Sequence, residues 1–352
     1  MRNLFICHSQ SHLILSAGLS KGRFAKDENH LILFKDFNLK EELKERLVNV
    51  FDSTLFLEGT YPAAQNMTVR GRVRWYRKDV RILQEELSVE YDRLFAVCGT
   101  YPVLFIIKKC LDSNQDIEVN WLEDGIIPYF ANTKAHMGLD SNAFTRRLRV
   151  ILYRKLLRLG NVCDRDFDEM GGLSVFKNAY VSYPEAVRDP YKKKKLIGIS
   201  SDEFNAGVNE LYLRHDLAVP NGAILLVMDK LDTYFSPDKV KSAIRFVFKF
   251  AKTNGIPVYC KLHPREDIIW EELENCIQLD KAVGAESMYL SLLPQREDIH
   301  IIGIKSAGLM TAVKMGFKVN SLFPKCGELN ADLELFFKSI GIHMLYGDIL
   351  YN

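Results

Sequence analysis

The sequence predicts an α/β protein made of two doubly wound units. Solidly apolar runs at residues 31–34 and 223–228 lack the alternation of half-exposed strands, which indicates strands that helices cover on both faces. Helical patterns alternate with such runs along the chain, as they do in parallel sheets joined by crossover helices. The 352 residues exceed what one ordinary hydrophobic core supports, so we expect two domains.

The first half of the chain begins with the strand, turn and helix of a parallel unit. The apolar residues 3–7 precede a polar turn at residues 9–11, and a helical pattern follows at residues 13–19. Further strands are expected at residues 31–34, 53–57, 91–97 and 117–122, and further helices at residues 39–51 and 104–110, with a basic helix starting near residues 70–81.

A run of four lysines at residues 192–195 separates the two halves. A charge run between patterned segments is typical of a linker, so the expected domains are residues 1–195 and 196–352. The second half repeats the alternation of strands and helices. Strands are expected at residues 223–228, 256–260, 300–304 and 317–323, and helices at residues 238–252, 283–290, 305–312 and 332–340.

Composition excludes several classes of protein. A net charge of +2 gives no global signature of nucleic-acid binding. Seven cysteines without a CxxC pair favour a reducing compartment, and we expect Cys7, Cys98 and Cys260 to be core thiols. The opening apolar run is too short for a signal peptide, and no window is long enough to span a membrane. We therefore expect a cytoplasmic protein, or one peripheral on the inner face of the cytoplasmic membrane.

One segment offers a route to such membrane contact. Residues 145–159 form a basic amphipathic helical pattern that ends at Gly160. A helix of this kind can lie on an anionic membrane. It is equally compatible with an ordinary surface helix whose arginine stems cover apolar area.

Two motifs place polar side chains directly after expected strands. Glu123, Asp124 and Gly125 follow the strand at residues 117–122, and two adjacent carboxylates can serve a ligand while the glycine permits a sharp turn. His263 follows another buried strand, and Pro264 biases its backbone toward an extended form. Ligands of open α/β sheets bind outside the carboxyl ends of the strands. A solvated turn is the alternative for each motif.

A third motif begins an expected helix after the strand at residues 300–304. Lys305 and Ser306 precede the small residues Ala307 and Gly308, which allow a ligand to approach closely. Backbone donors and the helix dipole at such a turn bind phosphate, to which Ser306 adds a hydroxyl and Lys305 a charge. A plain helix cap is the alternative.

Two further strand ends carry polar residues. Asp229 follows the buried strand at residues 223–228, where its carboxylate can act on a ligand. His8 and His12 lie four residues apart after the first strand. That spacing suits a metal on a helix, but no third ligand is near in sequence, so a polar loop facing a ligand is the better interpretation.

The order of these motifs resembles that of a known group of enzymes. Residues 123–125 (Glu-Asp-Gly), residues 263–264 (His-Pro) and Ser306 occur in sequence, with an opening strand at residues 3–7. Bacterial sialyltransferases share such an acidic-acidic-Gly motif, His-Pro motif and serine motif. The sequence looks most like the lipooligosaccharide sialyltransferases of glycosyltransferase family 52, and it is similar to the capsular polysialyltransferases. The resemblance spans most of the chain.

The resemblance implies the GT-B fold, in which two Rossmann-like domains face a central cleft. It implies an inverting, metal-independent transfer of sialic acid from CMP-sialic acid to a sugar hydroxyl of lipooligosaccharide or capsule. A terminal galactose is the expected acceptor. CMP-sialic acid is then a donor substrate, and neither a cofactor nor a metal site is expected.

The resemblance also assigns roles to single residues. Glu123 would be the general base with Asp124 in support, although which carboxylate is the base stays open. His263 would be the general acid or the phosphate partner of the departing CMP. Glu286 would hold the ribose, and Ser306 would bind the phosphate. These roles agree with the chemistry, because an acceptor hydroxyl needs a base and a leaving phosphate needs positive or hydrogen-bonding partners.

The chain also departs from the family pattern. Ala307 follows Ser306, where the family often has a second hydroxyl residue, which weakens the phosphate assignment unless Lys305 compensates. Asp229 is a second candidate for a base or donor-site carboxylate.

The sequence leaves three other functions open. The enzyme could extend polysialic acid, or it could use another CMP-linked acid such as Kdo. A non-catalytic nucleotide- or glycan-binding protein is the alternative from another class. The expected partners are a CMP-sugar and an oligosaccharide or lipooligosaccharide acceptor, with a homodimer left open and nucleic acid excluded.

Overall fold

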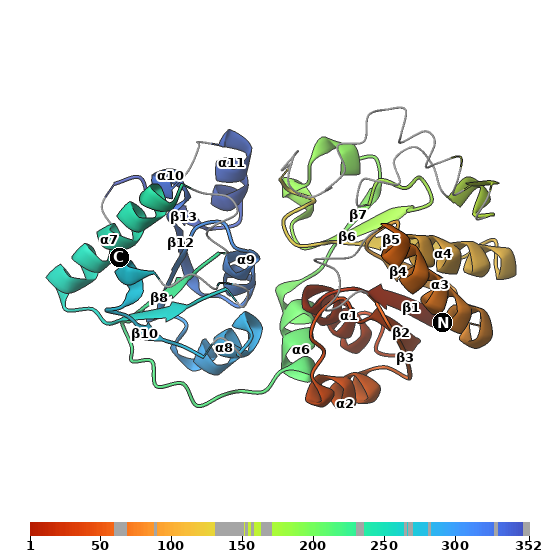
Figure 1. Cartoon of the computed structure of the whole chain (residues 1–352), viewed down its shortest axis with the longest axis horizontal. Helices are drawn as coiled ribbons and strands as arrows, with labels where there is room; N and C mark the ends of the chain where they lie inside the picture. Colours follow the sequence, from red (N-terminus) through yellow and green to blue (C-terminus); the bar gives the residue numbers. More distant parts are fainter. Residues whose placement is uncertain are drawn as a thin grey trace. The chain divides into compact units, whose positions relative to one another are not determined.

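The computed structural model divides the chain into two compact units, Met1–Leu211 and Tyr212–Asn352 (Figure 1). Each unit contains a parallel sheet with helices, as the sequence predicts. The structure describes residues 1–59, 69–87, 90–130, 151, 154–155, 158–162, 171–229, 236–263, 266, 270–280, 283–326 and 330–347.

The described part of the first unit contains a seven-stranded parallel sheet in the order β3-β2-β1-β4-β5-β6-β7. Helices α1, α2 and α6 contact one another, and α3 contacts α4. The strands are β1 (Arg2–Cys7), β2 (Glu28–Phe34), β3 (Ser53–Leu57), β4 (Arg93–Ala96), β5 (Glu118–Leu122), β6 (Asn178–Val181) and β7 (Lys195–Gly198). The helices are α1 (Gln10–Lys21), α2 (Glu41–Val50), α3 (Val69–Glu86), α4 (Tyr101–Ser113) and α6 (Ser201–Leu211), with short 3₁₀ turns at Gly160–Val162, Pro184–Ala186 and Asp189–Tyr191.

The strand order at the centre of this sheet determines where a ligand-binding edge forms. The chain runs from β1 outward to β2 and β3, and then returns to place β4 on the other side of β1. The fully buried rings of Phe5 and Phe95 stack across these two strands with centroids 4.6 Å apart. Burial of each ring contributes roughly 2–3 kcal/mol. The reversal of strand order between β1 and β4 is the position at which α/β sheets bind ligands.

The first unit extends beyond the boundary expected after residue 195. The lysine run at residues 192–195 is not a linker between the units, because Lys194 donates to two carbonyl groups of this unit and Lys195 begins β7. Helix α6 then packs on α1 with almost no space between the backbones. A Cβ added to Gly207 would lie 2.0 Å from the Ile14 carbonyl oxygen. The unit therefore ends after Leu211.

The second unit contains a six-stranded parallel sheet in the order β10-β9-β8-β11-β12-β13 within its described residues. Helix α7 lies on one side of the sheet, and α8 and α9 lie on the other (Figure 1). The strands are β8 (Ile224–Val227), β9 (Val258–Lys261), β10 (Ile277–Gln278), β11 (His300–Gly303), β12 (Lys318–Ser321) and β13 (His343–Met344). The helices are α7 (Pro237–Asn254), α8 (Ala285–Leu292), α9 (Ala307–Lys314), α10 (Phe323–Cys326) and α11 (Ala331–Ser339), with 3₁₀ turns at Glu271–Leu273 and Leu293–Gln295.

Single residues fix the ends of several elements. Ser9 caps α1 by accepting a hydrogen bond from the His12 amide. Gly255 ends α7 in the left-handed conformation with a φ of 65°. Gly125 also has a positive φ, 52°, which a turn directly after β5 requires.

Two other expectations have different outcomes. Cys98 is partly exposed and is not a core thiol, because it lies beyond the end of β4, whereas Cys7 and Cys260 are buried. The proposed membrane helix at residues 145–159 lies for the most part outside the described residues. Within the part of the chain that the structure describes, every helix is too short or too polar to cross a bilayer.

The contact between α1 and α6 gives a prediction about stability. Gly207→Ala should lower the free energy of unfolding of the first unit by about 2 kcal/mol or more, because the added methyl group forces the two helices apart. Asn209→Ala on the exposed side of the same helix is the control and should change stability little. Chemical denaturation of both variants measures the difference. A Gly207→Ala protein as stable as the wild type would contradict the close contact.

Candidate active site

Glu123 is held inside the first unit at the end of β5. Its side chain is 1% exposed. One carboxylate oxygen accepts hydrogen bonds from the Tyr129 hydroxyl and, at 2.7 Å, from the Ser182 amide. The other oxygen accepts from the Ser182 hydroxyl. A buried carboxylate with this many donors is well satisfied, so Glu123 ties the end of β5 to the residues that follow β6.

Asp124 faces another direction, as expected for adjacent residues of an extended chain. Its side chain is 26% exposed, and its Oδ1 lies 3.0 Å from Nε2 of the buried His12. Nδ1 of His12 accepts a hydrogen bond from the His8 amide, so the ring hydrogen lies on Nε2 and is donated to Asp124. The two carboxylates of the Glu-Asp-Gly motif therefore differ: one is enclosed, and the other is reachable.

The pairing of His12 with Asp124 was not predicted from the sequence, where the two residues are 112 positions apart. The available signal was their topology. His12 lies in the first turns of the helix after β1, and Asp124 follows β5, so both belong to the same edge of one parallel sheet. A histidine after the first strand and a carboxylate after a later strand can therefore be expected to meet.

Asp229 and Lys305 meet at the strand reversal of the second unit. Asp229 follows β8, Lys305 follows β11, and these strands are neighbours. The Lys305 amide donates to Oδ2 of Asp229 at 3.0 Å. Burial raises the pKa of Asp229 to about 6, against the opposing effect of the Lys305 and Ser306 amides. Burial also lowers the pKa of the Lys305 ammonium group, while Asp229 opposes that shift.

Ser306 caps α9 at the same place. Its Oγ accepts a hydrogen bond from the Gly308 amide at 3.1 Å, which leaves the hydroxyl hydrogen to donate. Gly308 is in tight surroundings, because an added Cβ would lie 3.3 Å from Ser306 Oγ and 3.7 Å from the Tyr289 hydroxyl. Ala307 is exposed at the first position of the helix. The motif is a genuine helix cap, and its amides lie beside Asp229.

Glu286 extends this cluster through two tyrosines that sequence reasoning missed. Burial raises the pKa of Glu286, with its own amide and Lys261 opposing. Glu286 in turn raises the already elevated pKa values of Tyr212 and Tyr289. Both tyrosine hydroxyls are buried and make no hydrogen bond among the described residues. Buried polar atoms without partners are costly, and they indicate a place where a ligand or water completes the hydrogen bonding.

His263 lies two residues beyond the end of β9, the strand next to β8. It is partly exposed, and its carbonyl accepts a hydrogen bond from the Glu266 amide at 2.9 Å. Pro264, the other half of the motif, lies outside the described residues. The structure therefore brings together Asp229, Lys305, Ser306, Gly308 and Glu286, with His263 after an adjacent strand.

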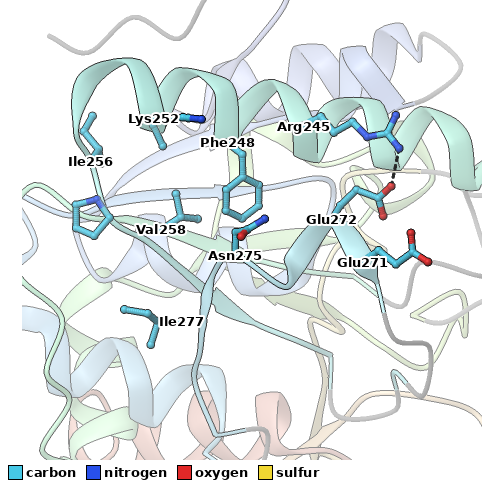
Figure 2. A pocket seen from close by; sticks show the side chains of 11 residues that line it. Arg245, Phe248, Lys252, Ile256, Val258, Glu271, Glu272, Asn275 and Ile277 are labelled. Carbon is cyan, nitrogen blue, oxygen red and sulfur yellow. Dashed lines mark hydrogen bonds and ion pairs between the residues drawn. The ribbon is translucent and has the colours of Figure 1, made fainter.

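The second unit also has an open cavity of about 760 Å³ that is separate from these residues (Figure 2). Phe248, Val258 and Ile277 line it, and Arg245 pairs with Glu272 at 2.9 Å. The cavity adjoins the beginning of β9, whereas His263 follows the end of that strand. It is therefore not part of the candidate site.

The buried carboxylate of Asp229 gives a pH-dependent prediction. A pKa raised in the folded state stabilises the protein below the ordinary value of 3.8, and this stabilisation is lost as the pH rises through about 6. Asp229→Asn keeps an oxygen for the Lys305 amide without the charge. It should raise the free energy of unfolding at pH 8 by about 1 kcal/mol, with the gain disappearing near pH 4.

Denaturation of the wild type, Asp229→Asn and a control variant at pH 8 and pH 4 measures this effect. Asp216→Asn, which changes an exposed carboxylate of the same unit, is the control and should show no such gain. A loss of stability in Asp229→Asn at pH 8 would contradict the idea that this charge is costly.

The sequence matches the model of the alpha-2,8-polysialyltransferase (POLYST) family over residues 3–316. This is the second of the two families that the sequence resembles, and membership of the lipooligosaccharide sialyltransferases stays a prediction. No curated protein matches the sequence at a significant level.

Solved structures resemble this chain in fold. UDP-GlcNAc 2-epimerase from Methanocaldococcus jannaschii has a TM-score of 0.58 and 12% identity, covering 98% of this chain and 89% of its own. The glycotransferase of kitacinnamycin has a TM-score of 0.56 and 12% identity, covering 98% and 86%. A sialyltransferase from Photobacterium damsela has a TM-score of 0.50 and 11% identity, covering 98% and 81%.

These likenesses show the GT-B type of α/β fold. The family match covers most of the chain, including the carboxylate, histidine and serine motifs. The chain therefore belongs to the alpha-2,8-polysialyltransferase family, and it is a glycosyltransferase of the sialyltransferase class.

Proposed function

We propose that this enzyme transfers sialic acid from CMP-sialic acid to a hydroxyl of a bacterial surface glycan, with inversion and without a metal ion. The observation that carries the proposal is the cluster at the strand reversal of the second unit. There the Ser306 cap, Gly308 and the amides at the start of α9 adjoin two buried tyrosine hydroxyls that lack partners. Such a site suits the phosphate and ribose of a nucleotide.

The donor is proposed to bind with its phosphate at Ser306 and its ribose at Glu286. The Ser306 hydroxyl has a hydrogen to donate, and the first amides of α9 carry the positive end of the helix dipole. Neighbouring side chains crowd Gly308, so a ligand can approach its backbone closely only because the residue has no side chain. Glu286 is close enough to two tyrosine hydroxyls to raise their pKa, and a ribose diol can bridge a carboxylate and a hydroxyl by donating to one and accepting from the other.

The leaving CMP gains negative charge as its bond to sialic acid breaks. His263, at the end of the strand next to β8, is proposed to neutralise this charge or to protonate the phosphate. A monophosphate carries less charge than a diphosphate, so protein donors can take the place of a divalent cation.

The Glu-Asp pair of the first unit is proposed to supply the base. Asp124 has the better access, and the Nε2–H group of His12 holds its carboxylate in place. Glu123 is enclosed by Ser182 and Tyr129, which favours a positioning role for it. The acceptor hydroxyl would lose its proton to Asp124 as it attacks the anomeric carbon.

The acceptor is proposed to be a sialic acid-ended glycan, because the matching family is described by an alpha-2,8-polysialyl product. A terminal galactose of lipooligosaccharide is the second candidate, supported by the resemblance of the motif order. The two candidates differ in whether the product is a polymer or a single added residue.

The test of function is the release of CMP from CMP-sialic acid. Release should increase on addition of an α2,8-linked sialic acid oligomer more than on addition of lactose, and it should continue in EDTA. Stimulation by lactose alone would favour the lipooligosaccharide acceptor. Loss of activity in EDTA that a divalent cation restores would contradict the metal-free scheme, and CMP binding without any release would contradict the transferase.

Variants of the proposed base and acid separate their roles. Asp124→Asn and His263→Ala should each lower the rate of transfer by about 100-fold or more, the scale of general acid–base catalysis. Glu123→Gln should lower it less and should reduce stability, since a buried hydrogen-bond network is disturbed. Glu185→Gln, an exposed carboxylate of the first unit, is the control. A full loss in Glu123→Gln beside a nearly normal Asp124→Asn would reverse the assignment.

A further inference from the structure

Three residues from adjacent strand ends meet beside the candidate base. His8 follows β1, Asp36 follows β2, and Cys98 follows β4. The strands lie in the order β2-β1-β4, so these ends are neighbours, and the reversal of strand order falls between β1 and β4. This is the general ligand-binding position of the first sheet.

The His8 ring is fixed by two contacts. Its Nδ1 pairs with Oδ2 of Asp36 at 2.7 Å. Its plane stacks on Phe34, with centroids 4.4 Å apart and an angle of 4° between the rings. The other ring nitrogen, Nε2, is enclosed and makes no hydrogen bond of ordinary length among the described residues. The ring is thus oriented by a carboxylate on one side and presents a buried nitrogen on the other.

Cys98 is the polar group next to this ring. Its sulfur is near the Thr100 amide, just before the first turn of α4. Burial raises the pKa of the Cys98 thiol, but His8 and the Thr100 amide outweigh burial and lower it, with Asp124 opposing them. Burial lowers the pKa of His8, but Cys98 and Asp36 raise it to about 10. Both shifts favour a thiolate beside an imidazolium.

The other described cysteines are in different surroundings. Cys7, Cys110 and Cys326 are buried, and burial raises the pKa of each to about 12. Cys276 is partly exposed, and its contact with the buried Cys260 lowers the pKa of its thiol, which donates to the Leu273 carbonyl. Among these residues, Cys98 alone combines partial exposure, an imidazole partner and a helix start, the features of a reactive thiol.

We propose that Cys98 is a reactive cysteine, oriented and activated by His8 and Asp36, that forms mixed disulfides with low-molecular-weight disulfides. The Cys98 thiolate attacks one sulfur of the disulfide. A new bond forms between that sulfur and Cys98 as the old S–S bond breaks, and the second sulfur leaves as a thiolate that takes a proton from water. A thiol reductant reverses the step.

The modification has a consequence for transfer, which rests on the proposed function. Asp124 is close enough to Cys98 to act on its pKa, and both lie at one sheet edge. A group attached to Cys98 would occupy the space beside the proposed base and remove the negative charge that faces His8. Transfer should therefore stop until the mixed disulfide is reduced.

Alkylation by iodoacetamide tests the thiol without reference to enzyme activity. Peptide mapping at pH 6.5 should show Cys98 alkylated at least about tenfold faster than the buried Cys7, Cys110 and Cys326, because even an ordinary thiol is only about 1% thiolate there. His8→Asn should abolish this advantage, and Cys276→Ser should preserve it. An equal rate at Cys98 in the wild type and His8→Asn would overturn the activation.

Glutathione disulfide tests the consequence. The wild type should gain a mixed disulfide on the Cys98 peptide and lose acceptor-stimulated CMP release, and dithiothreitol should restore the release. Cys98→Ser should retain release in the presence of glutathione disulfide. Full activity of the modified wild type would overturn the proposed control of transfer by Cys98. An absence of transferase activity in untreated protein would contradict the proposed function instead. The alkylation experiment would then still decide whether Cys98 is a reactive thiol.

Discussion

The reversal of strand order inside each parallel sheet is the constraint on which the rest of the molecule depends. Parallel strands deliver all their carboxyl ends to one edge, and the reversal sends the connecting helices to opposite faces. In the first unit the reversal separates β1 from β4, and in the second it separates β8 from β11. Nearly every polar residue of the candidate sites follows one of these strands or a direct neighbour.

The buried carboxylates at these edges differ in how their charge is stabilised. Glu123 is more deeply buried than Asp124, yet hydroxyl and amide donors satisfy both of its oxygens. Its hydrogen bonds therefore link the end of β5 to the segment after β6. Asp229 is held mainly by backbone amides, and burial still raises its pKa to about 6. A carboxylate that costs stability is retained more readily for ligand binding than for folding.

Much of the architecture could be predicted because the signals for strands and for helix ends are local in the sequence. Buried parallel strands appear as continuous apolar runs, and Ser9 and Gly255 mark helix ends by their own conformations. The order of the three motifs was also readable along the chain. The pairing of residues was less accessible, because Asp124 meets His12 and Cys98 meets His8 only after the strands are ordered in space.

Two interpretations of the sequence failed for the same physical reason. The charge of the lysine run predicts a linker, but the Lys194 ammonium group donates to carbonyl groups of its own unit. The apolar run before Cys98 predicts a core residue, but that strand ends at Ala96. Local composition does not reveal where a strand stops or which long side chain folds back.

The close contact between α1 and α6 at Gly207 bears on how the protein is synthesised. Helix α1 is synthesised long before α6, so the backbone surface that it presents to α6 is covered only when Leu211 is available. A nascent chain that stops after β6 leaves one edge of the sheet unpaired and one face of α1 open. The first unit is thus completed late in its own synthesis, and until then the growing chain exposes the kind of unpaired edge and apolar surface that chaperones recognise.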